Sequence, residues 1–284
     1  MINLVLDTLI HRWLRVPYQL HVHAHRTSKR HRRTVVLLHG LGNSGAAWDE
    51  VIEKLEPNIR VISLDLLGFG NSPRPTWAVY NVRTQARSVI ATLLSLRLSG
   101  RVILVGHSLG GLVSIEVAKR YPLIIRSLIL CSPPLYDQSS DSNLLIKSAF
   151  RRAKRHPERF LRLAAIAMKY NLVNKSFRVS DENIEPYMAT LGASILNQTS
   201  LDDVKKLNKP ITILFGTVDP WVKKRNLKSV IKANPRAELR VFLASHEIRG
   251  PYVQQVVKAI ADAARVPSKL RAIVSKNERY QLKP

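Results

Sequence analysis

The sequence predicts an α/β fold, with a mostly parallel, twisted β-sheet, helices on both of its faces and an inserted helical cap. Short apolar runs alternate with amphipathic stretches along much of the chain, as they do where crossover helices join parallel strands. Between residues 134 and 206 this alternation stops and only helical patterns remain, which predicts the cap.

Hydrophobic periodicity places the individual elements. Apolar residues recur at helical spacing from the N-terminus until Pro17 ends the pattern, and the alternating stretch 18–25 reads as a first strand. Further strands are expected at 34–40, 60–65, 101–106, 125–132, 209–216 and 237–244. Crossover helices are expected at 46–55, 84–96, 111–121 and 251–266.

The same pattern divides the chain into four parts. Residues 1–17 form an N-terminal amphipathic helix, 18–133 and 207–266 the α/β core, 134–206 the helical cap or lid, and 267–284 a basic C-terminal tail. An amphipathic helix of this kind can pack on the core or lie on a membrane surface, and the sequence leaves both open.

The chain is strongly basic, with 45 Lys and Arg against 20 Asp and Glu and a formal net charge of +25. Such a surface attracts polyanions, meaning nucleic acid, anionic lipid or acidic substrates. The sequence has no zinc-finger or RNP motif, so a specific nucleic-acid partner is not expected. The cap stretch 151–170 sets apolar residues beside a basic cluster, and it faces either the active site or an anionic membrane.

The sequence contains no apolar run of about 18 residues, so no spanning helix is predicted. Asp7, His11 and Arg12 interrupt the apolar N-terminal stretch, which therefore does not read as a signal peptide. The expected location is the cytoplasm, with peripheral contact to a membrane as the open alternative. The single cysteine, Cys131, ends an apolar strand and is expected to be an inert core residue.

A motif for nucleophilic catalysis lies in VGHSLGG, residues 105–111. Its Gly-x-Ser-x-Gly pattern stands between a strand and a helix, where a sharp turn needs small neighbours such as Gly106 and Gly110. This turn places Ser108 at the carboxyl end of the sheet, where open α/β sheets bind ligands. The N–H of Leu109 opens the following helix and points toward developing negative charge.

A serine nucleophile needs a base, and the base needs an orienting acid. His246 follows the last predicted strand, and Asp219 follows the strand before it. Because both residues and Ser108 lie in loops at the carboxyl ends of strands, the sheet is expected to bring them together. A second oxyanion donor is expected in the loop after LLHG, at the N–H of Leu41.

The chain resembles the α/β-hydrolase fold family over residues 18–266. The segments that carry the resemblance are VVLLHGLGNSGAAW, VISLDLLGFGNS, VGHSLGG, ITILFGTVDPW and SHEIRGP, in the family's order and spacing. The resemblance implies that Ser108 is the nucleophile, His246 the base and Asp219 the acid, and that the two amides named above form the oxyanion hole. Some members take the acid from the position of Asp137. No metal or organic cofactor is implied.

Within that family, the residue types favour a serine hydrolase of carboxylic esters, a carboxylesterase or lipase-like enzyme with a small-molecule ester substrate. Members that open epoxides or remove halides use Asp where this chain has Ser108. Carbon–carbon bond hydrolases share the triad but typically have an aromatic residue after the base, where this chain has Glu247. Two alternatives stay open: such a carbon–carbon bond hydrolase, or a non-catalytic scaffold that binds a ligand or an anionic surface.

The remaining polar residues near these motifs are expected to be structural. His39 and His107 flank the predicted site, each inside one of the motifs, and Asp65 is expected to fix a loop. Three imidazoles alternate along the first strand, at His21, His23 and His25. A solvated strand face is favoured over a metal site there, because no nearby Cys or acidic residue completes a ligand set.

Overall fold

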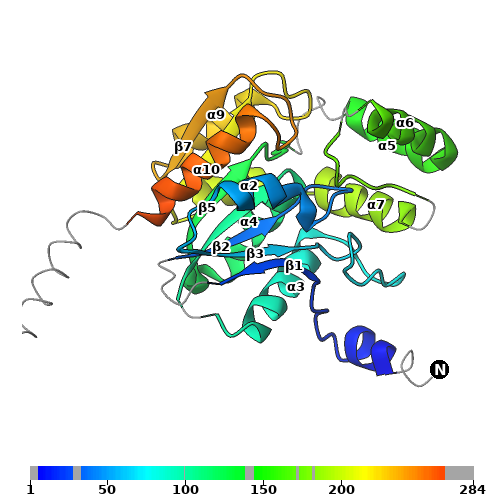
Figure 1. Ribbon diagram of the computed structural model, residues 1–284. Helices are drawn as coiled ribbons and strands as arrows, with labels where there is room; N and C mark the ends of the chain where they lie inside the picture. Colours follow the sequence, from blue (N-terminus) through cyan, green and yellow to red (C-terminus); the bar gives the residue numbers. More distant parts are fainter. Residues whose placement is uncertain are drawn as a thin grey trace, which may run out of the picture.

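The computed structural model describes residues 6–27, 33–98, 100–137, 144–170, 173–180 and 183–265. Its centre is a seven-stranded sheet in the order β1-β3-β2-β4-β5-β6-β7, in which β1 alone pairs antiparallel (Figure 1). The strands are β1 (Val22–Arg26), β2 (Arg33–Leu38), β3 (Ile59–Leu64), β4 (Val102–His107), β5 (Ile125–Cys131), β6 (Ile211–Gly216) and β7 (Ala237–Phe242). The predicted α/β fold with a mostly parallel sheet is therefore confirmed.

Helices cover both faces of the sheet because both faces of its central strands are apolar. On one face, Val36 and Leu38 join a core with α3 (Val82–Ser95), α4 (Leu109–Arg120), α8 (Ser200–Lys206) and α9 (Lys224–Ala233). On the other face, Val35 and Leu37 pack with α2 (Asp49–Lys54), the preceding turn η2 (Gly45–Trp48) and α10 (Pro251–Ala264). These two layers hold the carboxyl ends of the strands rigidly in place.

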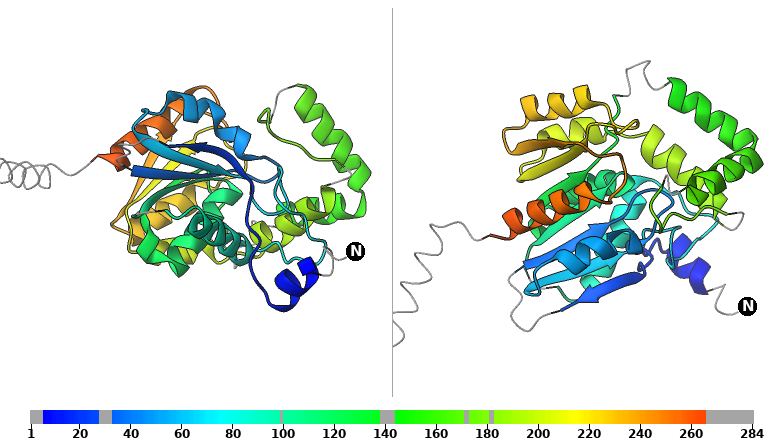
Figure 2. Two further views of the ribbon diagram at one scale, coloured as in Figure 1. Left: turned by 60° about the horizontal axis from the view of Figure 1, so that its bottom comes forward. Right: turned by 45° about the horizontal axis from the view of Figure 1, so that its top comes forward.

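A helical segment is inserted between β5 and β6. It contains α5 (Leu144–Arg155), α6 (Pro157–Lys169), α7 (Ile184–Thr190) and η5 (Leu191–Leu196), and α5 and α6 stand away from the sheet (Figures 1 and 2). Gln198 Nε2 donates to the Pro134 carbonyl at 2.9 Å, so the segment leaves and rejoins the core through one neck. The range 134–206 also includes α8, which buries Leu201 and Val204 in the main core rather than among these helices.

The N-terminal segment contains a short π-helix, η1 (Thr8–Trp13), and a stretch without regular secondary structure joins it to β1. Asp7 Oδ2 accepts a hydrogen bond of 2.6 Å from the hydroxyl of the buried Tyr18, and the His11 ring stacks on the Tyr18 ring at 3.7 Å between centroids. The polar side of the helix therefore faces the protein. In the part of the chain that the structure describes, no helix combines the length and apolar character needed to cross a bilayer. The predicted tail 267–284 lies outside the described residues.

Candidate active site

The serine turn joins β4 to α4 through a strained backbone. Ser108 has φ 50° and ψ −115°, outside the regions that L-residues ordinarily adopt, and its N–H donates to the Cys131 carbonyl at 2.9 Å. A Cβ at Gly106 would lie 2.2 Å from the Gly110 carbonyl oxygen, and one at Gly110 would lie 2.2 Å from the Leu38 carbonyl oxygen. Both positions therefore need glycine, and the turn holds Ser108 at the end of β4.

The predicted base and acid lie side by side. His246 follows β7, Asp219 follows β6, and His246 Nδ1 lies 2.8 Å from Asp219 Oδ2. The Asp219 side chain is fully buried and that of His246 is 13% exposed. Because the carboxylate can only accept, the Nδ1–H donates to it, and Nε2 of the neutral ring is left as the basic nitrogen. The alternative acid, Asp137, is exposed at the end of a described stretch.

The Asp219 carboxylate is held by several donors. Its Oδ1 accepts from the N–H groups of Trp221 at 2.9 Å and Val222 at 3.2 Å. Burial opposes its ionisation, but the hydrogen bonds from His246, Ser132 and the Trp221 amide outweigh burial and hold the pKa of Asp219 below its ordinary value. The acid is thus charged at neutral pH.

Ser132 supports the site, although no pattern in the sequence pointed to it. It adopts φ 47° at the end of β5, and its hydroxyl lies 2.9 Å from the Tyr252 hydroxyl. Tyr252 in turn donates to the Leu214 carbonyl at 2.9 Å. This buried group of hydroxyls joins the acid to α10 and β6.

Two buried histidines organise the backbone around the serine turn. His39 Nε2 accepts from the Leu66 N–H at 2.8 Å, so its protonated Nδ1 donates to the Gly40 carbonyl at 2.7 Å. His107 Nε2 donates to the His246 carbonyl at 2.8 Å. Burial lowers the pKa of His39 to about 4 and that of His107 to about 3, so both rings are neutral at pH 7. These contacts agree with the structural roles expected for them.

The loop after β2 lies against the serine turn. A Cβ at Gly40 would lie 3.3 Å from the Ser108 Cβ, so the backbone of Gly40 lies close to the turn. Leu109 is the first residue of α4, where amides have no acceptor within the helix. Asp65 fixes the neighbouring loops, since its carboxylate accepts from the Gly45 N–H at 2.6 Å and from a second loop amide.

A strap from the inserted segment, residues 173–178, ties the loop after β2 to the histidine loop. The Arg178 N–H donates to the Gly42 carbonyl at 2.7 Å, and Ser176 Oγ donates to Asn43 Oδ1 at 2.8 Å. At the other end, the Asn174 N–H donates to Glu247 Oε2 at 3.2 Å. Burial raises the pKa of Glu247 above its ordinary value. The sequence placed the strap only within the cap and gave no sign of these contacts.

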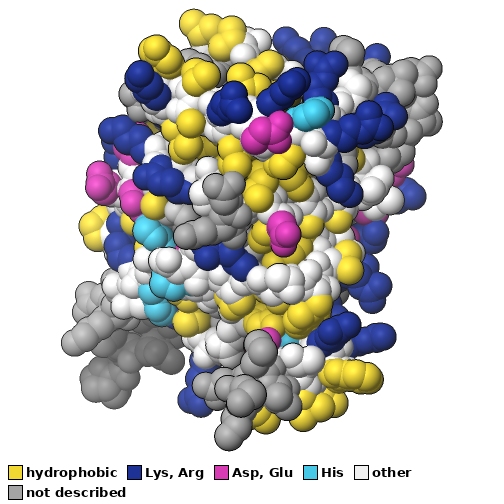
Figure 3. All heavy atoms as spheres, turned by 90° about the vertical axis from the view of Figure 1, so that its right-hand side faces the viewer, with side chains coloured by type: hydrophobic (Ala, Val, Ile, Leu, Met, Phe, Trp, Pro, Cys, Tyr) yellow, Lys and Arg dark blue, Asp and Glu magenta, His cyan; other side chains and the backbone are white. Residues whose placement is uncertain are grey.

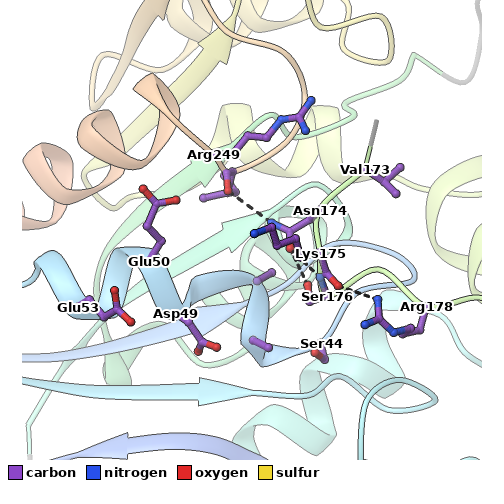
Figure 4. Close-up of a pocket in the computed structure, with 13 residues that line it drawn as sticks. Ser44, Asp49, Glu50, Glu53, Val173, Asn174, Lys175, Ser176, Arg178 and Arg249 are labelled. Atoms are coloured by element: carbon purple, nitrogen blue, oxygen red, sulfur yellow. Dashed lines mark hydrogen bonds between the residues drawn. The ribbon is translucent and has the colours of Figure 1, made fainter. Parts of the chain in front are cut away.

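A cleft of about 650 Å³ lies between the strap and α2 (Figure 4). Glu50 and Glu53 project from the α2 side, while Lys175 and Arg249 belong to the opposite side. None of the three predicted triad residues is among its lining residues, so the cleft is not the site of the predicted chemistry.

The histidines of the first strand have partners of their own. His23 Nε2 lies 2.9 Å from Asp49 Oδ1, and His25 Nε2 lies 2.8 Å from the Arg60 guanidinium. Among the residues that the structure describes, no group of three or more His, Cys, Asp or Glu side chains is arranged to hold a metal ion. Cys131 is buried, and burial raises the pKa of its thiol.

Comparison with known proteins identifies the family to which this chain belongs. The family model for the alpha/beta hydrolase fold matches residues 33–248, and the chain belongs to that family. It is 29% identical over 241 residues to a pimeloyl-[acyl-carrier protein] methyl ester esterase of Aeromonas hydrophila, covering 80% of this chain and 93% of that protein. It is 33% identical over 116 residues to the probable lysophospholipase BODYGUARD 2 of Arabidopsis thaliana, a match of 39% of this chain and only 25% of that relative.

Solved structures share the same fold. A thermophilic esterase from Thermogutta terrifontis superposes with a TM-score of 0.65 at 23% identity, covering 86% of this chain and 97% of that chain. A meta-cleavage product hydrolase superposes with a TM-score of 0.58 at 22% identity, covering 81% and 90% of the two chains. The protein is thus an alpha/beta hydrolase with esterases among its relatives.

Proposed function

We propose that this chain is a serine hydrolase that cleaves carboxylic esters through an acyl-enzyme on Ser108. The observation that carries the proposal is the 2.8 Å contact between His246 Nδ1 and Asp219 Oδ2 beside the strained serine turn. With Nδ1–H committed to the acid, His246 Nε2 removes the proton of the serine hydroxyl as it attacks the ester carbonyl. Asp219 holds this tautomer and stabilises the charged ring.

The Leu41 and Leu109 amides bind the oxyanion that forms at the carbonyl oxygen in this mechanism. Each such donor contributes about 3 kcal/mol to transition-state stabilisation in comparable sites. His246 then protonates the leaving alcohol, and water attacks the acyl-enzyme with the same ring as base. Each step uses groups of the chain itself.

The choice of an ester follows from the relatives and from one residue of the site. The Aeromonas relative is named for a methyl ester and the Arabidopsis relative for a lysophospholipid, and both substrates contain a carboxylic ester. The fold likeness to a meta-cleavage product hydrolase keeps carbon–carbon bond cleavage as the second candidate. Glu247 argues against that candidate, because it places a partly buried carboxyl directly after the base, where those enzymes typically have an aromatic residue.

A fluorophosphonate probe tests the nucleophile directly. The wild-type protein should be labelled on Ser108, the Ser108→Ala variant should not, and a Ser44→Ala variant should be labelled like the wild type. Turnover of p-nitrophenyl esters of graded chain length should fall by several orders of magnitude in Ser108→Ala alone. Labelling of a folded Ser108→Ala protein would contradict the assignment.

A matched pair of substrates then separates the two candidate reactions. The proposal requires hydrolysis of p-nitrophenyl esters and no turnover of a meta-cleavage dienoate. Turnover of the dienoate with inert esters assigns carbon–carbon cleavage instead. No labelling and no turnover of either substrate by the folded wild-type protein would identify a non-catalytic scaffold.

A further inference from the structure

The N-terminal segment turns its apolar side away from the protein. Asp7 and His11 contact Tyr18, while the apolar residues of the same segment point outward. Trp13 is 73% exposed and Leu14 is 66% exposed. Four further apolar residues of the segment are 38–48% exposed: Leu6, Leu9, Ile10 and Val16. A helix that packs on its own core does the reverse, so this apolar side is available to a binding partner.

Most charged residues beside this apolar side are arginines. Arg12 and Arg15 are exposed on the segment itself, and Arg83 and Arg87 belong to the adjacent α3, where the Arg87 guanidinium donates to the Arg15 carbonyl at 2.6 Å. The stretches 8–48 and 66–115, which supply these elements, contain no Asp or Glu at all. The nearest acid on the segment, Asp7, is bonded to Tyr18.

A second patch of the same composition lies on the same side of the molecule. Helix α6 exposes Leu163 and Ile166, and Tyr170 just after it is also exposed, with basic residues beside them. Both η1 and α6 project from this side (Figures 1 and 2), and Figure 3 shows apolar and basic side chains intermixed over it, with a few acidic ones. Apolar residues ringed by Lys and Arg are the composition of surfaces that insert shallowly into anionic bilayers.

We propose that η1 and its flanking arginines dock this protein on the surface of an anionic lipid bilayer. The outward apolar side chains enter the boundary between headgroups and acyl chains, with Trp13 at the interface, and the arginines contact lipid phosphates. Because the helix is anchored through its polar side, docking needs no unfolding of the core. Delivery of amphiphilic esters from the bilayer to Ser108 is a corollary that rests on the proposed function; the docking itself does not.

Vesicle co-sedimentation at low and high salt tests the docking. Vesicles of phosphatidylcholine with phosphatidylglycerol should bind the full chain, pure phosphatidylcholine should bind it weakly, and salt should weaken the first. Arg12→Gln with Arg15→Gln should lower the partition coefficient about 25-fold at low salt, from roughly fivefold for each charge, or ~1 kcal/mol. Lys228→Gln with Lys232→Gln on α9, beside β7, removes the same charge and should have little effect.

Apolar insertion is tested by two further measurements. Trp13→Gln with Leu14→Gln should abolish binding to anionic vesicles, whereas Leu123→Gln, which removes another exposed leucine, should not. Brominated lipid should quench part of the tryptophan fluorescence of the wild type, and Trp13→Phe should remove that part. Because these residues are exposed, hydrolysis of a water-soluble p-nitrophenyl ester should be unchanged and reports both folding and the proposed activity.

Three results would overturn the docking proposal. The first is equal sedimentation with neutral and anionic vesicles. The second is an anionic-vesicle affinity that Trp13→Gln with Leu14→Gln leaves unchanged. The third is a lipid-free dimer that these two substitutions dissociate, which would assign the apolar side to a second copy of the chain. Loss of esterase activity with intact vesicle binding would contradict the proposed function and leave the docking standing.

Discussion

Adjacent glycines at the start of α4 should respond to alanine in opposite ways. A Cβ at Gly110 would lie 2.2 Å from the Leu38 carbonyl oxygen and 2.7 Å from that of His39, and neither backbone atom can rotate away. A Cβ at Gly111 meets nothing closer than the Pro133 Cβ at 3.3 Å. One turn of one helix therefore supplies both the test and its control.

The magnitudes follow from the two contacts. Replacing glycine by alanine inside a helix stabilises it by about 1 kcal/mol. Gly110→Ala must also push α4 away from the end of β2, which costs ~3 kcal/mol or more by analogy with overpacked cores. The net loss of about 2 kcal/mol corresponds to a fall in Tm of roughly 4–8 °C. Gly111→Ala should stay within about 1 kcal/mol of wild type.

Urea unfolding followed by circular dichroism measures both variants. The same displacement moves the strained Ser108 turn, so fluorophosphonate labelling should slow in Gly110→Ala and remain fast in Gly111→Ala. Equal unfolding midpoints for the two variants would refute the reasoning, because the clash at Gly110 would then have been relieved at no cost.

Three further predictions concern ionisable groups. Asp219→Asn should lower kcat by about 10⁴ because the amide favours the wrong imidazole tautomer, whereas Asp137→Asn should leave ester hydrolysis nearly unchanged; the reverse ranking would move the acid to residue 137. Burial raises the pKa of Glu247, so in the folded protein this group keeps its proton at pH values where the unfolded chain has lost it. The free energy of unfolding therefore falls as pH rises above about 4.5. Glu247→Gln should thus stabilise the protein more at pH 8 than at pH 4 in urea unfolding, and an equal gain at both would contradict this. His39 and His107 have pKa values of about 4 and 3 in the folded protein, whereas the same rings bind protons near pH 6.5 in the unfolded chain. The free energy of unfolding should therefore fall between pH 7 and pH 4. In NMR titrations the His39 and His107 rings should then fail to titrate above pH 5.

The positions of the candidate catalytic residues could be predicted from the sequence because they lie at the ends of strands. Ser108, Asp219 and His246 each follow a strand, and parallel strands end at one edge of the sheet, so the contact between His246 and Asp219 could be predicted from the sequence. That Ser108 works with this pair stays a prediction. Gly106 and Gly110 were predictable for a related reason, since a strand-to-helix turn needs small residues.

The residues that support the site were not predictable in this way. Asn174 meets Glu247 across 73 positions, and Ser132 meets Tyr252 across 120 positions, through single polar contacts that leave no periodic pattern. The N-terminal helix shows a different limit. Its periodicity identified an apolar side, but periodicity does not say whether that side faces the core, and here Asp7 and His11 face the core instead.

Because Pro134 and Gln198 hydrogen-bond to each other, the inserted segment is a long loop, here called the branch, whose two ends meet at the core. The entropy of closing a loop grows only with the logarithm of its length, so doubling or halving the branch changes the cost by about 0.6 kcal/mol. Strands β5 and β6 remain neighbours whatever the branch contains. Helices α5 to α7 can therefore lengthen, shrink or be exchanged between homologues during evolution while the sheet keeps its stability and its strand order.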